Sequence, residues 1–472
     1  MYKSPSARSS DDNAPSAEAV PLQSLNRSSI DFLASSDLDQ LLADDASDAS
    51  SLDKPIDGSR QAWIVFFGCW IIEFMIWSLP LSYGVFQEYH SNHELFKSST
   101  AIPTVGTLTA GTSNLCMPFM SMVAARWPQY RRTQMIAGWV LCVLALIGAS
   151  FANSIEVLLL CQGLLYGLGW VVHYTPVMFI LNEWFDKQRG LVYGILFSAS
   201  GVAGLVQPAL LNWMLRTFDF KITFRVYALA IICVSGPGLL LIRSRDVPRR
   251  PLVPTKALAS LQPIVRSLQF QLIAFAVFVQ GLGFFIPRIY INSYSSDLGF
   301  SQNIGAGLLA LISLSQVCGQ IGQGWVSDRL DVRIPMSLST LLCGLAALLL
   351  WGPAKSVWPL IFLALMWGLL SASYSVLYSR MCTFLVGKED IHGDRDSVVM
   401  LMYGIFSFER GISGALAGPI SSWLIGSSEQ AIDVDAYGLG KYAGIVWFTG
   451  ICMLVAATMG IGRLLPPKTN DK

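Results

Sequence analysis

Long apolar runs alternate with short polar segments over most of the chain. A helix that crosses a membrane needs roughly 20 mostly apolar residues, and twelve stretches of this kind occur among the 472 residues. The pattern predicts transmembrane helices at 62–86, 101–123, 133–152, 156–181, 189–214, 224–243, 270–292, 304–327, 334–352, 356–380, 398–424 and 442–463. We therefore expect an all-α membrane protein.

The loops between these helices differ in charge. If the amino terminus lies in the cytosol, the cytosolic loops and the C-terminal tail hold 19 Lys or Arg, and the loops on the other side hold six, counted with the adjoining helix ends and without the N-terminal tail. Because basic loops stay in the cytosol, we expect both termini there. The plasma membrane is the default location, and a vacuolar or peroxisomal membrane is the alternative.

A basic, proline-containing segment divides the helices into two groups of six. We predict a disordered cytosolic tail at 1–61, a six-helix bundle at 62–243, a linker at 244–269, a second bundle at 270–463 and a short tail at 464–472. The first tail holds 11 of the 31 acids and 14 serines, a composition that cannot build a core. It is not a signal peptide, and a phosphorylation or sorting segment is the alternative to a signalling tail.

The two groups of helices show a weak internal repeat. The fifth helix reads YGILFSASGVAGLVQPALLNW from Tyr193, and the eleventh reads YGIFSFERGISGALAGPISSW from Tyr403. Six residues match in order between them. The first and seventh helices also match near their ends, at Pro80–Tyr83 and Pro287–Tyr290. Two pseudo-symmetric six-helix bundles are the layout of a secondary transporter, whose binding site lies between them near the midplane.

Composition and the lack of certain motifs argue against several other classes of function. The chain is 53% hydrophobic and 13% charged, with a mean hydropathy of +0.51, whereas soluble domains carry about 25% charge. A net charge of +1 argues against nucleic-acid binding. The nine cysteines and four histidines form no metal-ligand spacing, and neither a P-loop nor a catalytic constellation appears. We expect neither an enzyme nor a cofactor.

The loop after the eighth helix carries the first family resemblance. The run Gly324-Trp325-Val326-Ser327-Asp328-Arg329-Leu330-Asp331-Val332-Arg333 resembles the GxLaDRxGRR signature of the major facilitator superfamily. An Asp at a helix end can pair with the amino terminus of a neighbouring helix and with Arg. The resemblance therefore implies a cytosolic gate, for which we name Asp328, Arg329, Arg333, Lys187 and Arg189.

A narrower resemblance is to the monocarboxylate porter family, in its fungal branch. It covers residues 57–463 and rests on Asp57-Gly58-Ser59, on Gln162–Pro176 and above all on Trp184–Leu191 with the glycines that follow. Leu159 stands where drug antiporters of the superfamily have Arg. The Lys and the charged pair of animal monocarboxylate porters are also missing, since Leu81 and an uncharged helix at 304–327 take their places. The resemblance implies carboxylate transport without that machinery.

Few ionisable residues fall inside the predicted helices, where a charge is costly. Glu73 and Glu409 are candidates for carrying a proton, because a carboxylic acid in an apolar, aromatic setting can exist in its neutral form. Arg410 and Arg288 are candidates for gripping a substrate carboxylate, which a guanidinium matches with two hydrogen bonds. For each residue the alternative is a structural contact within or between helices.

Polar and aromatic side chains also recur at helical spacing on three helices. His173 and Tyr174 lie in the fourth helix, and His173 shares a face with Gln162, Tyr166 and Pro176. The stripe on the eighth helix includes Gln316 and Gln320, and that on the tenth includes Tyr374 and Tyr378. We expect these residues to line a central pathway, although interhelical hydrogen bonds would use similar stripes.

We therefore predict a transporter that moves a small organic carboxylate or secondary metabolite by alternating access, with possible proton symport. Its partners would be the substrate, protons and the lipid bilayer, without nucleic acid, and a monomer would suffice. One alternative is an exporter of a neutral or cationic metabolite or drug. The other is a membrane nutrient sensor that signals through the serine-rich tail without moving a substrate.

Overall fold

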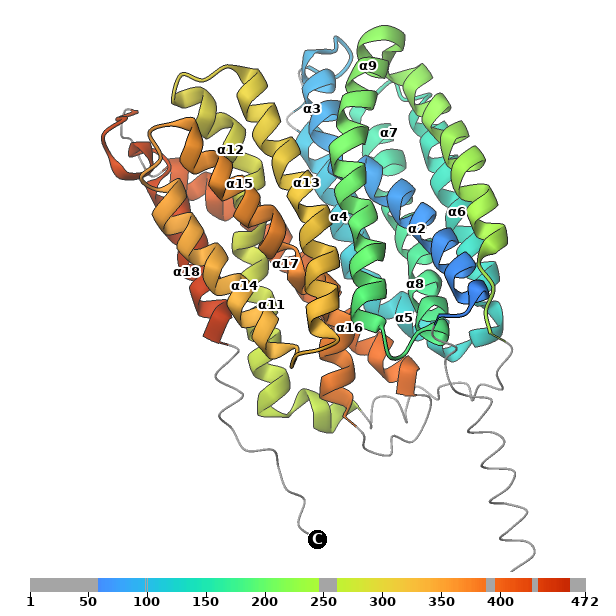
Figure 1. Ribbon diagram of the computed structural model, residues 1–472. Coiled ribbons are helices and arrows are strands. Elements are labelled where there is room, and N and C mark those ends of the chain that lie inside the picture. The colour runs from blue at the N-terminus through green and yellow to red at the C-terminus, as the bar shows by residue number, and fades with distance from the viewer. Residues whose placement is uncertain are drawn as a thin grey trace, which may run out of the picture. The chain divides into compact units, whose positions relative to one another are not determined.

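The computed structural model describes residues 58–97, 99, 101–245, 261–387, 395–426 and 432–458, which fold almost entirely as helix (Figure 1). The described ranges contain no strand. The predicted tail as far as residue 57, residues 246–260 of the predicted linker and everything from residue 459 onward lie outside them.

The first half of the structure, residues 58–245, contains α2 (Arg60–Leu81), α3 (Tyr83–Asn92), α4 (Ile102–Leu115), α5 (Met117–Arg126), η1 (Pro128–Tyr130), α6 (Arg131–Ala149), α7 (Ile155–Leu158), the π-helical η2 (Leu159–Leu165), α8 (Tyr166–Trp184) and α9 (Arg189–Leu241). The second half, residues 261–458, contains α11 (Leu268–Phe284), α12 (Ile286–Asp297), α13 (Gln302–Ser327), α14 (Arg333–Ala346), the π-helical η3 (Ala347–Trp351), α15 (Val357–Ser371), α16 (Ser373–Val386), α17 (Arg395–Gly426), η4 (Tyr437–Leu439) and α18 (Ala443–Ala457).

These helices occupy the twelve predicted spans as far as the residues are described. Eight helical segments are long and apolar enough to cross a membrane. One of them, α9, contains two predicted spans, because Asp219 interrupts it with a φ of 69°. The pair α4–α5, the helix α17 and the shorter α18 supply the remaining three. The membrane fold predicted from the hydrophobic pattern is confirmed.

Among the spans that are broken close to a proline, two are related by the sequence repeat. The first is interrupted at Ser82, two residues after Pro80, and the seventh at Phe285, two residues before Pro287. Proline removes a backbone donor and clashes with the preceding turn of a helix. These breaks lie in the pair of helices that the sequence repeat relates, and they allow polar side chains nearby to face the centre of the molecule.

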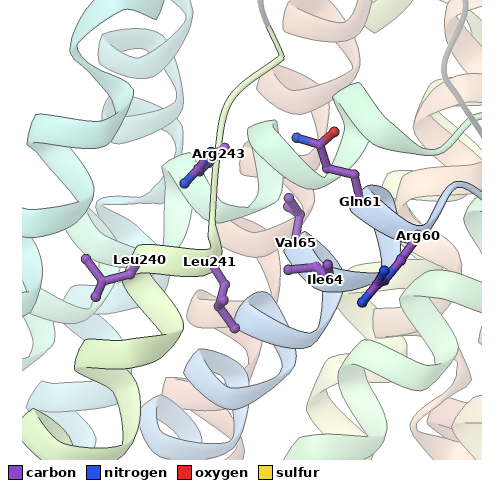
Figure 2. A pocket seen from close by; sticks show the side chains of 7 residues that line it. All are labelled: Arg60, Gln61, Ile64, Val65, Leu240, Leu241 and Arg243. Carbon is purple, nitrogen blue, oxygen red and sulfur yellow. The ribbon is translucent and has the colours of Figure 1, made fainter.

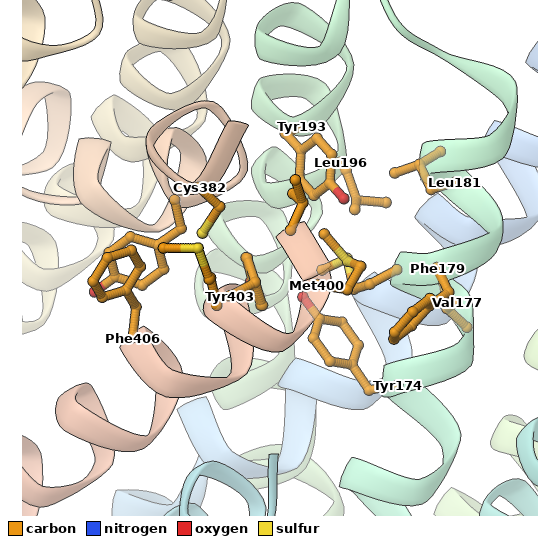
Figure 3. Close-up of a cluster of buried hydrophobic side chains, with 14 of the residues drawn as sticks. Tyr174, Val177, Phe179, Leu181, Tyr193, Leu196, Cys382, Met400, Tyr403 and Phe406 are labelled. Carbon is orange, nitrogen blue, oxygen red and sulfur yellow. The ribbon is translucent and has the colours of Figure 1, made fainter. Parts of the chain in front are cut away.

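The buried apolar side chains of the described residues form three clusters. The shared cluster joins both halves and includes Tyr174, Val177, Leu181, Tyr193 and Leu196 of the first half and Tyr378, Cys382, Met400, Tyr403 and Phe406 of the second. Figure 3 shows side chains of α8 and α9 converging on those of α16 and α17. A second cluster lies within the first half, around Phe86, Cys142 and Phe224. A third lies within the second half, around Tyr294, Cys343 and Trp367.

The positions of these clusters divide the molecule into two sides. The lower side is the end at which α2 begins and α9 and α18 end, at the bottom of Figure 1. The shared cluster lies toward this side, and the other two clusters extend toward the opposite, upper side. The two halves therefore share an apolar core only toward the lower side.

Five of the six glycines of the sequence repeat lie where the halves meet, and Gly414 packs within its own half. A Cβ placed on Gly201 of α9 would lie 2.8 Å from a methyl group of Val317 in α13. A Cβ on Gly404 of α17 would lie 3.1 Å from Pro118 of α5, and one on Gly411 would lie 2.6 Å from the Cβ of Asn114 in α4. Small residues let helix backbones approach closely in a membrane, so the repeated motif packs the two halves together.

Candidate functional site

Asp328, at the end of α13, caps the beginning of α9 across the boundary between the halves. Its two carboxylate oxygens accept hydrogen bonds from the backbone N–H groups of Gly190 and Leu191, each at 2.8 Å. Gln188, at the cap position of α9, makes no side-chain capping bond of its own. A carboxylate at a helix amino terminus satisfies free N–H groups and complements the helix dipole. This contact fastens α13 to α9 on the lower side.

A second polar contact joins the halves nearby. Arg189 donates from Nη2 to Asp396 Oδ1, at the beginning of α17, across 2.9 Å, and from Nε to the carbonyl oxygen of Phe185. Arg380 of α16 lies 3.8 Å from the Asp328 carboxylate and donates to the carbonyl of Ser327. Asp328 and Arg189, two of the five residues that we named for the gate, therefore lie at the contact between the halves.

The other three named gate residues occupy different surroundings. Arg329 lies over the ring of Trp325, four residues before it, at 3.7 Å. Arg333 pairs with Asp331 at 2.6 Å and lies 4.8 Å from the ring of Phe384. Lys187 is exposed. These contacts of Arg329 and Arg333 lie within the second half.

Toward the upper end of the molecule, the ion pairs among the described residues lie within one half or the other. Lys441 pairs with Asp297 at 2.9 Å, and Lys355 pairs with Asp435 at 2.8 Å, both in the second half. The neighbouring Lys355 ammonium holds the pKa of Asp435 below its ordinary value. In the first half Asp219 accepts a hydrogen bond from Tyr89. These contacts stabilise each half separately and do not join them.

Arg288 and Gln316 form a polar line between the halves above the shared cluster. Arg288, in α12, donates to the side-chain oxygen of Gln316 in α13. The amide nitrogen of Gln316 lies 3.4 Å from the hydroxyl of Ser200 in α9 and donates to it. The predicted stripe on α13 thus faces the first half at Gln316. Gln320, one turn below, is buried, and its side-chain oxygen has no hydrogen-bond partner among the described residues.

Arg410 is held in a similar way within the second half. Its Nη1 donates to the side-chain oxygen of Gln280 in α11 at 2.8 Å. The Gln280 amide donates in turn to the carbonyl of Ser371. The guanidinium lies 4.1 Å from the centre of the Phe284 ring, a cation–π distance. A glutamine therefore holds each of the two arginines, Arg288 and Arg410.

Glu73 is buried in α2, with 1% of its surface exposed. The Trp77 indole and the Tyr174 hydroxyl face its carboxylate. Neither carboxylate oxygen accepts a hydrogen bond of ordinary geometry from the described residues, so these two donors lie close by without reaching it. Trp77 and Tyr174 are themselves joined through Trp170, whose ring contacts both. An acid in such a setting carries its charge at a high cost.

A series of tyrosines connects Glu73 to Arg410. Tyr174 faces Tyr403 of α17 as well as Glu73. The ring of Tyr403 packs edge-on against that of Tyr378, with centres 6.0 Å apart. The Tyr378 hydroxyl in turn faces Arg410. The structure thus brings an acid of the first half and a base of the second half to opposite ends of one buried aromatic chain.

The remaining predicted residues lie outside this aromatic chain. Glu409 is partly buried, and its Oε2 has no hydrogen-bond partner among the residues that the structure describes. Tyr374 is buried and donates to the carbonyl of Ala456. His173 points away from the second half, because its Nδ1 lies 2.8 Å from the carbonyl of Met135 in α6. Tyr174, its neighbour in sequence, faces the boundary instead.

Three residues of this site are not among those predicted from the sequence. Gln280 is a single amide within a long apolar run, and this isolation was a usable signal. Tyr403 was noted only as part of the repeat. Asp396 follows a polar loop like any exposed acid, and nothing in the sequence indicated that it pairs with Arg189, 207 positions away.

The sequence of this chain is similar to those of known membrane transporters. The model of the Major Facilitator Superfamily matches residues 62–393. The MFS transporter asaE of Aspergillus flavus is 24% identical over 424 residues, which cover 88% of this chain and 91% of the relative. Monocarboxylate transporter 11 of Mus musculus is 26% identical over 385 residues, covering 78% of this chain and 82% of the relative. The resemblance inferred from the motifs is confirmed.

A solved structure shows the same fold. The fucose:proton symporter FucP of E. coli superposes with a TM-score of 0.61 at 13% sequence identity, covering 86% of this chain and all of the symporter chain. This likeness extends over both halves of the structure described above. The twelve spans, the paired halves and the family match lead to one conclusion: the chain belongs to the major facilitator superfamily of membrane transporters.

Proposed function

We propose that this transporter carries a small organic anion with a carboxylate group and couples its movement to a proton. The observation that carries the proposal is the way in which Arg288 and Arg410 are held. Neutral glutamines, Gln316 and Gln280, orient the two guanidinium groups. Among the described residues neither group has an acidic partner. Both arginines are partly buried, and a charge withdrawn from water is costly until a partner neutralises it, which a carboxylate would do.

Glu73 supplies a group for proton coupling, and Glu409 is the second candidate. The carboxylate of Glu73 lacks hydrogen bonds in the closed cluster, so its neutral form suits this arrangement better than its charged form. Opening the lower side would admit water to Tyr174 and to the acid beside it. A proton taken up on one side of the membrane and released on the other would then accompany the substrate.

Alternating access agrees with the one-sided contact between the halves. The lower side is closed by the shared cluster, by Asp328 on α9 and by the Arg189–Asp396 pair. The charge bias of the loops supports a cytosolic lower side. In that orientation the state described here faces outward, with both termini in the cytosol. The plasma membrane is the location that we propose, and one chain contains both halves of the site, so a monomer suffices.

The proposed substrate class agrees with the aromatic lining and with the relatives. Tyr174, Tyr378 and Tyr403 offer ring surface and hydroxyl groups to a molecule larger than a simple short-chain acid. The name of one relative, monocarboxylate transporter 11, also supports a carboxylate. A carboxylate-bearing secondary metabolite fits both observations.

The test is a comparison of cells with and without the protein. Untargeted mass spectrometry of cells and medium at external pH 5 and pH 7 identifies the compounds that move and the direction of movement. We expect one or more organic acids among them, with a flux that responds to pH after substrate ionisation is corrected for. The Arg410→Ala and Arg288→Ala variants should each reduce this flux at least tenfold, and Arg216→Ala, an exposed control of equal charge change, should leave it within twofold.

The alternatives predict different results. Flux of a neutral or cationic compound that survives both alanine variants would overturn the anion proposal and favour an exporter of such compounds. A cellular response that requires residues 1–55 without any measurable flux would favour a sensor. A fluorescent fusion that locates the protein to the vacuole or peroxisome would correct the membrane that we propose.

A further inference from the structure

A cavity of about 440 Å³ lies on the flank of the first half, away from the boundary between the halves. It opens between the beginning of α2 and the end of α9 on the lower side. Figure 2 shows its lining, with Arg60, Gln61 and Ile64 from α2 facing the segment that ends at Arg243. The volume falls within the range of about 300–1,000 Å³ that is typical of small-molecule pockets.

The cavity is positively charged at its mouth. Arg60 and Arg243 both line it, and its lining contains no acid. The neighbouring acid, Glu183, is engaged elsewhere, since it pairs with Arg131 at 2.8 Å and accepts hydrogen bonds from Ser244 and from the backbone of Arg245. Among the described residues neither Arg60 nor Arg243 has an ion-pair partner. The mouth therefore offers two guanidinium groups to an anion.

The segment that carries Arg243 is held in place. The Trp184 indole donates to the carbonyl oxygen of Arg243 at 2.9 Å, and the Glu183 carboxylate fixes the two residues that follow. On the other wall Ser59 caps α2 by accepting a hydrogen bond from the N–H of Ala62. The two walls are thus positioned by contacts that do not involve the guanidinium groups of Arg60 and Arg243.

The remaining walls of the cavity are apolar and continue along the outer surface. Ile64 is 41% exposed and Leu240 is 67% exposed, and Phe67, one turn above Ile64, is 56% exposed. On a helix that crosses a membrane, such side chains face lipid tails. A ligand that fits this surface has an anionic head at the arginines and a hydrocarbon tail along Ile64 and Leu240.

We propose that this cavity binds the phosphate headgroup of an anionic phospholipid. Basic pockets between transmembrane helices on the cytosolic side suit such headgroups, and the orientation proposed above places the lower side there. The acidic segment that precedes Gly58 is the alternative occupant, because its negative charge also complements the two arginines. The apolar wall favours the lipid, because an acidic peptide makes no use of Ile64 and Leu240.

Native mass spectrometry of the purified full chain tests this proposal. The protein is mixed with phosphatidylinositol, phosphatidylserine or phosphatidylcholine in a neutral detergent, and the bound lipid is counted. We expect one tightly retained anionic lipid and no retained phosphatidylcholine. The double variant Arg60→Gln/Arg243→Gln should lose at least tenfold in affinity. The control Arg126→Gln/Arg132→Gln removes two charges at the same end of the molecule and should stay within twofold.

A second variant guards against misfolding of the first. Ile64→Trp fills the apolar wall at an exposed position and leaves both charges, and it should also weaken lipid retention at least tenfold. An equal loss in the control pair would show a general charge effect and overturn the site. Displacement of the lipid by 10 mM inorganic phosphate would show a free-anion site instead. Lipid retention that appears only after residues 1–55 are deleted would identify the tail as the occupant.

Discussion

Arg189, at the start of α9, donates a hydrogen bond of 2.9 Å to the carboxylate of Asp396, at the start of α17. This bond joins the two halves. The Arg189 side chain is 6% exposed and the Asp396 side chain is 40% exposed, so water reaches the pair from the side of the acid and its contribution stays near that of a surface ion pair, about 0–1 kcal/mol. Beside it, Asp328 caps α9. The polar part of the lower closure therefore depends on very few side chains, and single substitutions should shift it.

Asp328→Ala should open the lower side. The substitution leaves the N–H groups of Gly190 and Leu191 without their acceptor, and the loss of a helix cap costs about 1–2 kcal/mol. The population with an open lower side should rise about five- to thirtyfold. The native Cys382, fully buried in the shared cluster, reports this change through its rate of alkylation by N-ethylmaleimide, followed by peptide mass spectrometry.

Two other native cysteines serve as controls for that measurement. Cys142 belongs to the cluster within the first half and Cys343 to the cluster within the second. Their alkylation should not change when the halves separate. Parallel acceleration of all three thiols would indicate general unfolding, and the proposed role of Asp328 would then be wrong.

Gly411→Val should have a similar effect by a different route. A Cβ at Gly411 would already lie 2.6 Å from the Cβ of Asn114, so valine must push α17 away from α4. Overpacking of this kind costs about 1–3 kcal/mol. We expect faster Cys382 alkylation and at least a tenfold loss of substrate flux. Gly418→Val on the same helix is the matched control, because no atom lies within 4 Å of its Cβ, and it should behave like the wild type.

Glu73→Gln should remove a pH dependence of the lower closure. Charging Glu73 within the apolar cluster is costly, so a rise in pH from 5 to 8 should favour the open lower side in the wild type. The ratio of Cys382 to Cys142 alkylation cancels the common effect of pH on thiol reactivity and should rise with pH. In the glutamine variant the ratio should stay constant.

The other ionisable groups that face Glu73 are Tyr174, Tyr403 and Cys69. Tyr403→Phe tests whether a hydroxyl rather than the acid controls the ratio, and it should retain the pH response. A pH response that persists in Glu73→Gln and disappears in Glu409→Gln would show that Glu409, and not Glu73, controls the closure of the lower side.

Asp219→Ala should lower the stability of the first half. Asp219 adopts φ 69° and ψ 162°, a region that costs a residue with a side chain about 1–3 kcal/mol. Its carboxylate compensates by accepting hydrogen bonds from the N–H of Phe220 and from Tyr89. Alanine keeps the strain and loses these bonds, so Tm should fall by a few degrees in thermal unfolding of the purified protein. Asp219→Gly relieves the strain and should recover part of the loss.

The hydrophobic pattern was sufficient for the helices, because a span of roughly 20 apolar residues has few alternatives in a bilayer. Even the division at residue 219 lies between the two spans predicted within α9. The breaks at Ser82 and Phe285 were not predicted, since proline indicates that a kink is possible without fixing its position. The domain boundaries at 61, 244 and 464 stay predictions.

For the site, the sequence identified ionisable residues but not their partners. Glu73, Arg288 and Arg410 stood out because charge is rare in a membrane helix. The side chain that each one faces depends on the rotation of its helix and on which helices become neighbours. His173 and Tyr174 illustrate this limit, because adjacent positions on a helix point about 100° apart and only one of the two reaches the boundary. The roles of Gln280 and Asp396 can be recognised only when the positions of Arg410 and Arg189 are known.

The division of the apolar core into one shared and two separate clusters bears on cooperativity. A domain with a single core melts in one step, whereas each half here retains a core of its own when the shared cluster is pulled apart. Loss of contact between the halves and loss of structure within a half are therefore distinct events with distinct free energies. We accordingly expect a melting curve of this protein to be a sum of transitions, and a substitution such as Asp219→Ala to affect only one of them.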